Sequence, residues 1–167
     1  PNVGTAFVLA RYAAAGGERL PETLLFEEGA GLVPVRLIDE HGVTTGAELR
    51  VPEALSRRSQ VSPEQVAACL SLDAHQVNTQ AHPPQVVSVG LPFLVVELDS
   101  REALRHCVPN LQGSRPILPL AGAVSIYAYT LDTAVDDQSD VQARMVTPRL
   151  TDGPAPGSSA AATTAPP

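Results

Sequence analysis

The fold depends most on residues 1–17, whose sequence is PNVGTAFVLARYAAAGG. This pattern predicts a helix over residues 3–15 that ends at two glycines, which adopt left-handed backbone angles at low cost. Except for one threonine and one arginine, the helix is apolar on every side, whereas a helix at a protein surface has a polar face. We therefore expect the rest of the fold to surround this helix.

Three short strands are predicted next, over residues 23–28, 32–38 and 44–51. The segments between them are tight turns that contain glycine, which supplies the positive φ angles that such turns need. Short runs of this kind, separated by short turns, predict an antiparallel meander.

A second helix is predicted over residues 63–72. Ser62 is its expected N-cap, a proline occupies the first helical position, and Gln65 completes a capping box. The polar stretch over residues 75–84 then ends in two prolines, and we place a domain boundary within it.

The second half of the chain contains the same kinds of element. Apolar or alternating runs predict strands, and a short run capped by Ser100 predicts a helix. The strands are expected over residues 86–90, 92–98, 123–131 and 140–146, and the helix over residues 100–107. Residues 151–167 lack large apolar side chains, so they cannot bury enough surface to offset their ordering entropy, and we expect a disordered tail.

The composition excludes several classes of function. The net charge is -7, and all 11 basic residues are arginine. Without a basic stripe, a nucleic-acid partner is not expected. Without any lysine, the chain has no Schiff-base residue, no pyridoxal-phosphate anchor and no phosphate-binding P-loop.

Metal and membrane sites are also not expected. Cys69 and Cys107 lack metal-site spacing and are interpreted as buried thiols, which favours a reducing, cytoplasmic setting. The acidic residues Asp136, Asp137 and Asp140 are either a weak cation site or a solvated loop, and the lack of regular ligand spacing favours the loop. No apolar run approaches the ~20 residues of a membrane span.

Three segments together resemble the PhzF-like family of phenazine-biosynthesis isomerases. They are PNVGTAFVLA (residues 1–10), VSVGLPFLVVEL (residues 87–98) and DVQARMVTPRL (residues 140–150). The resemblance implies an α+β fold of the diaminopimelate-epimerase type, with two similar half-barrel lobes, each around a central helix. Both lobes would be incomplete here: residues 1–80 would be the C-terminal part of the first, and residues 81–150 the N-terminal part of the second.

The resemblance also implies a chemistry and a set of site residues. Family members move protons between carbon atoms of a small carboxylate-bearing metabolite without metal, flavin or nucleotide, and they commonly form homodimers. The substrate lies between the lobes, where helix N-termini favour a carboxylate. Carried over to this chain, the substrate-binding residues are Asn2, Val3, Gly4, Ser88, Gly90, Pro92, Gly157 and Ser158, and the candidate catalytic residue is Asp152. Arg144 is either an anion partner or a surface side chain. None of His41, His75, His82 or His106 lies at a position that the resemblance makes catalytic, and all four are expected to be solvated.

The sequence departs from the family pattern where catalysis is carried out. The family's acid/base Glu and cleft His would both precede Pro1, and the family motif EDPATGS is matched only by DGPAPGS at residues 152–158. In this match Asp152 lies one place before the family's acidic residue, and the second central helix has no counterpart. We therefore expect an internal piece of an isomerase that lacks much of its catalytic equipment.

Two other functions are considered. A non-catalytic binding or scaffold domain of the same fold would keep the cleft without its acid and base. A tautomerase would use the secondary amine of Pro1 as a base, but tautomerase subunits begin with a strand, whereas a helix is predicted here.

Overall fold

The computed structural model describes residues 2–28, 31–51, 53–117, 119–134 and 139–148 of the 167-residue chain. The chain divides into two compact units, Pro1–Ala54 (unit 1) and Leu55–Pro167 (unit 2). The domain boundary expected near residue 80 therefore lies inside unit 2, because residues 55–80 pair and pack with the strands that follow them. The predicted tail, residues 151–167, lies outside the described residues.

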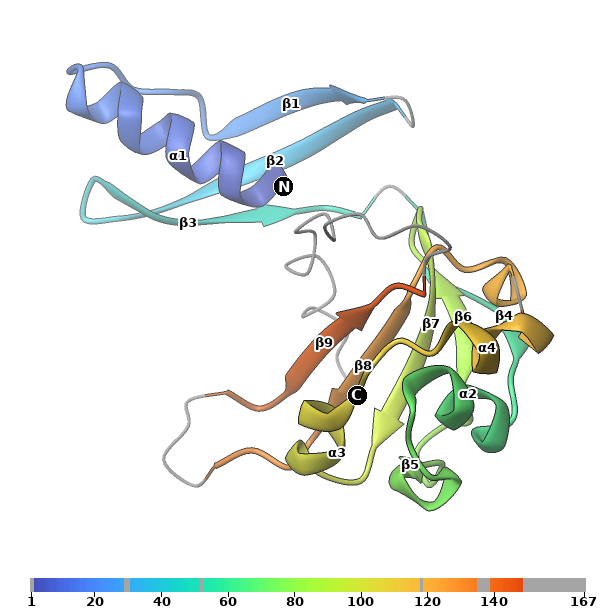
Figure 1. Ribbon diagram of the computed structural model, residues 1–167. Coiled ribbons are helices and arrows are strands. Elements are labelled where there is room, and N and C mark those ends of the chain that lie inside the picture. The colour runs from blue at the N-terminus through green and yellow to red at the C-terminus, as the bar shows by residue number, and fades with distance from the viewer. Residues whose placement is uncertain (1, 29–30, 52, 118, 135–138, 149–167) are drawn as a thin grey trace. The chain divides into compact units, whose positions relative to one another are not determined.

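Unit 1 contains one helix and one three-stranded sheet (Figure 1). The helix is α1 (Asn2–Ala15), and the strands are β1 (Thr23–Glu28), β2 (Gly31–Glu40) and β3 (Val43–Leu49). The strand order is β1-β2-β3, and both pairs are antiparallel. The structure thus contains the predicted helix and the predicted meander.

The turn between β2 and β3 explains why this meander forms. His41 and Gly42 have φ angles of 51° and 81°. A two-residue hairpin turn that matches the strand twist needs positive φ at both central positions, and glycine adopts it without strain. The predicted solvated turn at His41 is therefore a tight hairpin with an exposed tip.

Helix α1 packs against the sheet of unit 1 along one side only. Its buried residues are Ala6 and Ala10, one helical turn apart, and they belong to the same cluster as Val33 and Val35 of β2. Tyr12, in contrast, is 81% exposed. The expectation that protein surrounds this helix is wrong for the described residues, because a three-stranded sheet covers one side of a helix and leaves the other open.

Unit 2 contains a six-stranded sheet and short helices. The strands are β4 (Ser56–Gln60), β5 (Val77–Asn78), β6 (Gln85–Ser88), β7 (Pro92–Leu98), β8 (Ile126–Thr130) and β9 (Gln142–Val146). The helices are α2 (Pro63–Leu70), α3 (Arg101–His106) and α4 (Leu111–Ser114), with 3-10 turns at Ala74–Gln76, Arg115–Ile117 and Leu120–Gly122. The strand order is β4-β6-β7-β8-β9, and β5 also pairs with β7. Strand β8 runs parallel to β7, whereas the other pairs are antiparallel.

The core of unit 2 lies between one face of this sheet and the helices. Alternate side chains of β7, including Leu94 and Val96, point to this face and join one buried cluster with Ile126 of β8. Leu70 of α2 and Leu104 of α3 belong to the same cluster. The helices therefore cover this face of the sheet.

Helix α2 begins as predicted. The Oγ atom of Ser62 accepts a hydrogen bond from the backbone N–H of Gln65, and the Gln65 side chain accepts one from the backbone N–H of Ser62, both at 3.3 Å. These two bonds satisfy donors that a helix N-terminus otherwise leaves unpaired. Within the described ranges, no helix has both the length and the hydropathy needed to cross a membrane.

Candidate functional site

The first turn of α1 holds three of the predicted binding residues. Val3 and Gly4 are exposed, and a Cβ atom at Gly4 would meet no atom within 4 Å. The side-chain amide of Asn2 donates a hydrogen bond to the Glu28 carboxylate of β1. The turn itself contains no acidic residue. Through the Asn2 side chain, Glu28 places a carboxylate beside the positive end of the helix.

Three further predicted residues meet at the hairpin between β6 and β7. Ser88 and Pro92 are opposite one another in the register, and the buried Ser88 hydroxyl accepts a hydrogen bond of 3.1 Å from the Gly90 N–H. Gly90 has a φ angle of 138°, which side chains rarely adopt, so glycine is required there. The hairpin presents neutral hydrogen-bonding groups, which suit binding better than proton transfer.

The two sets belong to different compact units: Asn2, Val3 and Gly4 to unit 1, and Ser88, Gly90 and Pro92 to unit 2. The candidate acid Asp152 and the predicted anion-binding turn at Gly157 and Ser158 lie outside the described residues, as does Pro1. Their roles stay predictions.

A polar network in unit 2 was missed by sequence reasoning. The Tyr129 hydroxyl of β8 donates to Oε2 of Glu97 at 3.0 Å and contacts Nε2 of His82 at 2.8 Å. The second Glu97 oxygen accepts from the Asn78 amide at 2.7 Å, and Nδ1 of His82 lies 2.8 Å from the Pro83 carbonyl oxygen. The expectation that His82 is solvated is therefore wrong.

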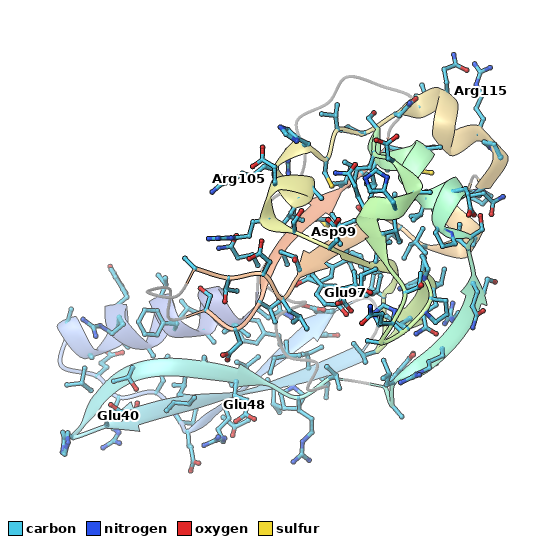
Figure 2. The ribbon with its side chains drawn as sticks, turned by 90° about the horizontal axis from the view of Figure 1, so that it is seen from below. Glu40, Glu48, Glu97, Asp99, Arg105 and Arg115 are labelled. Atoms are coloured by element: carbon cyan, nitrogen blue, oxygen red, sulfur yellow. The ribbon has the colours of Figure 1, made fainter. Side chains whose placement is uncertain are left out.

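Glu97, labelled in Figure 2, is 4% exposed. It lies on β7, the central strand in the order β4-β6-β7-β8-β9. Burial raises the pKa of the Tyr129 hydroxyl, and its hydrogen bond to Glu97 raises this pKa further, because an ionised phenol would face a carboxylate. The phenol therefore stays a hydrogen-bond donor. The sequence did contain one signal for this network, a carboxylate within the apolar run of residues 92–98.

The two cysteines are buried free thiols, as predicted. Burial raises the pKa of both, and that of Cys107 reaches about 11 although Arg144 opposes the shift. Because the thiolate is the reactive form, a raised pKa keeps both thiols unreactive at neutral and mildly alkaline pH. We expect the native protein to react with a disulfide reagent at pH 8 only after urea is added. Rapid release of the coloured thiol from native protein would contradict this assignment.

No three His, Cys, Asp or Glu side chains converge in a metal-ligand cluster within the part of the chain that the structure describes. Asp136 and Asp137 of the predicted acidic loop lie outside that part.

The comparisons with known proteins agree with one another. The family model of phenazine biosynthesis-like proteins matches residues 1–165. An uncharacterized isomerase of Mesorhizobium japonicum is 29% identical over 171 residues, which cover 97% of this chain and 54% of that protein. The chain therefore spans about half the length of this relative.

Solved structures show the same fold. The phenazine biosynthesis protein of the PhzF family from Bacillus anthracis superposes with a TM-score of 0.69 at 20% identity, covering 87% of this chain and 47% of that one. A predicted epimerase from Pseudomonas aeruginosa gives 0.58 at 24% identity, covering 77% and 43%. These likenesses confirm the predicted α+β fold of the PhzF and epimerase type. With a family model that matches nearly its whole length, the chain belongs to the family of phenazine biosynthesis-like proteins.

Proposed function

We propose that this protein acts in a cofactor-independent isomerisation or epimerisation, in which a proton is moved on a small carboxylate-bearing metabolite. The family match over residues 1–165 carries this proposal. The name of the Mesorhizobium japonicum relative, an isomerase, supports it.

The described residues support a role in holding the substrate. The first turn of α1 presents backbone N–H groups at the positive end of a helix, and such groups bind a carboxylate without a cation. In the other unit, the Ser88 hydroxyl accepts from the Gly90 N–H and keeps its own hydrogen as a donor. A proton-transfer step needs in addition an acid and a base on either side of the reacting carbon. We assign the acid, as a proposal, to Asp152, with Gly157 and Ser158 completing the anion-binding turn.

A second candidate function is a binding domain that has no turnover. One observation favours it: among the described residues, the hydrogen bonds at Ser88, Gly90 and Pro92 involve only serine hydroxyls and backbone groups. Carboxylate binding at such a hairpin requires no acid/base pair. We also propose that the protein is a cytoplasmic homodimer, and the exposed apolar side chains of α1 support self-association.

Hydrogen exchange distinguishes the two functions. We expect that incubation in deuterated water with a panel of amino acids and unsaturated carboxylic acids places deuterium at one carbon-bound position of a compound that also binds. Binding without labelling would assign the non-catalytic function, and neither binding nor labelling would contradict both. The variant Ser88→Ala is expected to weaken binding, whereas Ser59→Ala, on the exposed strand β4, is the matched control.

A further inference from the structure

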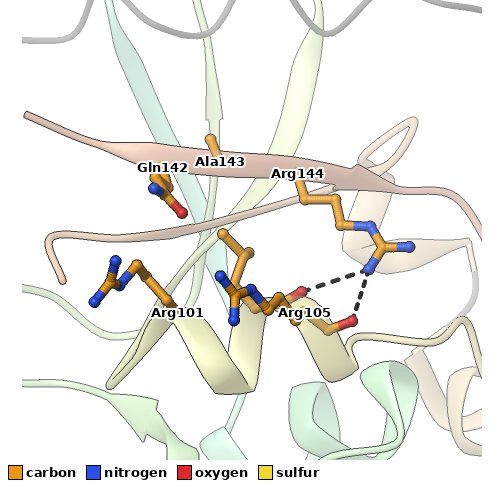
Figure 3. Close-up of a pocket in the computed structure, with 6 residues that line it drawn as sticks. Arg101, Arg105, Gln142, Ala143 and Arg144 are labelled. Carbon is orange, nitrogen blue, oxygen red and sulfur yellow. Dashed lines mark hydrogen bonds between the residues drawn. The ribbon is translucent and has the colours of Figure 1, made fainter. Parts of the chain in front are cut away.

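A pocket of about 430 Å³ lies between α3 and β9, within unit 2. Its lining residues are Arg101, Leu104 and Arg105 of α3 and Gln142, Ala143 and Arg144 of β9 (Figure 3). None of these is among the predicted substrate-binding residues, and only Arg144 was considered from the sequence as an anion partner. Three of the chain's 11 arginines thus line one pocket in a protein whose net charge is -7, and this concentration of positive charge indicates an anion site.

Arg144 is held in place by the end of the neighbouring helix. Its Nη1 atom donates to the carbonyl oxygens of Leu104 at 3.5 Å and Arg105 at 3.1 Å (Figure 3). These carbonyls belong to the last turn of α3, where a cation is favoured. A guanidinium has five N–H donors, so two bonds from one nitrogen leave other donors for a ligand.

Arg101 and Arg105 each form a long contact with a carboxylate. Arg101 Nε lies 3.5 Å from Asp132, and Arg105 Nη1 lies 3.6 Å from Glu102. Close charge-assisted hydrogen bonds are shorter, at roughly 2.7–2.9 Å. The Arg105 and Glu102 side chains are 72% and 64% exposed, and pairs exposed to this extent contribute little to stability. Exchanging such a partner for a ligand oxygen therefore costs little.

Among the described residues, two of the three arginines that line the pocket pair with carboxylates, those of Asp132 and Glu102. Glu102 also pairs with His106 at 3.3 Å. The backbone N–H of Arg101 bonds to Asp132 and, with the Arg101 guanidinium nearby, lowers the pKa of that carboxyl. Asp132 and Glu102 thus each have a partner besides the arginine side chains of the pocket. A doubly charged anion is attracted electrostatically by all three arginines, whereas a neutral ligand is not.

We propose that the pocket between α3 and β9 binds a small oxyanion with two negative charges, such as a phosphate group. The planar fork of an arginine matches the oxygens of a phosphate, and arginines of both α3 and β9 line the pocket. Leu104 supplies an apolar wall beside them. The site lies outside the residues assigned to the substrate carboxylate, so it adds a second anion to the protein's ligands.

The test is a titration of the full chain with inorganic phosphate at constant ionic strength, followed by the NMR signals of the backbone amides. We expect saturable shifts concentrated at Leu104, Arg105, Ala143 and Arg144. Arg105→Gln should weaken the affinity for phosphate roughly fivefold, because it removes one exposed charged contact. The double variant Arg101→Gln/Arg105→Gln should abolish saturation.

Arg58→Gln is the matched control, because Arg58 is an exposed arginine of the same unit on strand β4, far from the lining residues in the sheet order. It should bind phosphate as the unmodified protein does. Equal affinities of Arg105→Gln and Arg58→Gln, or the same shifts with chloride, would overturn the proposal. If the double variant loses its folded spectrum, the exposed single variant Arg105→Gln decides the outcome. Failure here leaves the isomerase proposal intact, because deuterium labelling reads out a different site.

Discussion

Replacing Gly113 with alanine is expected to destabilise unit 2 by about 3 kcal/mol, at the upper end of the range for overpacked cores. Gly113 lies in α4, and a Cβ atom there would be 2.1 Å from the carbonyl oxygen of Ala68 and 2.5 Å from its carbonyl carbon. Both atoms belong to the backbone of α2, so no side-chain rotation relieves the overlap. Helix α4 would have to move away from α2 and expose part of the core.

Urea unfolding followed by the tyrosine signal of unit 2 measures this effect. The matched control is Gln112→Ala, because Gln112 is an exposed residue of the same helix, α4. The control should change the free energy of unfolding by less than about 1 kcal/mol. An unchanged midpoint for Gly113→Ala would show that α2 and α4 do not pack as closely as the structure has them.

Removing the Tyr129 hydroxyl is the second substitution with a large expected effect. In Tyr129→Phe, Glu97 Oε2 and His82 Nε2 lose the group that lies between them, at 3.0 Å and 2.8 Å. Glu97 is buried, so its oxygen cannot simply regain water. Loss of a hydrogen bond to a charged, buried group costs about 2 to 3 kcal/mol.

Thermal or urea unfolding of Tyr129→Phe should show this loss, and the NMR signals of the His82 ring should move. Ser59→Ala is the control, because it removes an exposed hydroxyl from the same unit. If both variants have the same unfolding midpoint as the parent protein, the network contributes nothing to stability. The Glu97 carboxylate must then have another hydrogen-bond donor.

Local signals in the sequence predicted much of the fold. The capping box at Ser62 and Gln65 involves residues three apart, and the β2–β3 turn at His41 and Gly42 depends on two neighbouring φ angles. Ser88, Gly90 and Pro92 meet for the same reason, since one hairpin contains all three. Interactions between residues that are only a few positions apart can be recognised in the sequence.

What the sequence did not reveal depends on partners that are distant along the chain. Strand β4 (Ser56–Gln60) has the sequence SRRSQ, which has no apolar alternation, and it is a strand because β6 pairs with it at the sheet edge. His82 and Tyr129 are 47 positions apart. The apolar character of the helix predicted over residues 3–15 indicated complete burial, but hydropathy does not say how much sheet is present to cover a helix.

The parallel pairing of β7 with β8 has a consequence for how the chain folds while it is being translated. Leu94 lies opposite Ile126, and the chain between them forms α3 and α4. During translation the β6–β7 hairpin can close at once, but one edge of β7 has no neighbour until β8 has left the ribosome. Contacts between distant residues slow folding and prolong the exposure of apolar strands. The nascent chain therefore passes through a stage in which Leu94 and Val96 are available to chaperones, whereas the meander of unit 1 is already complete.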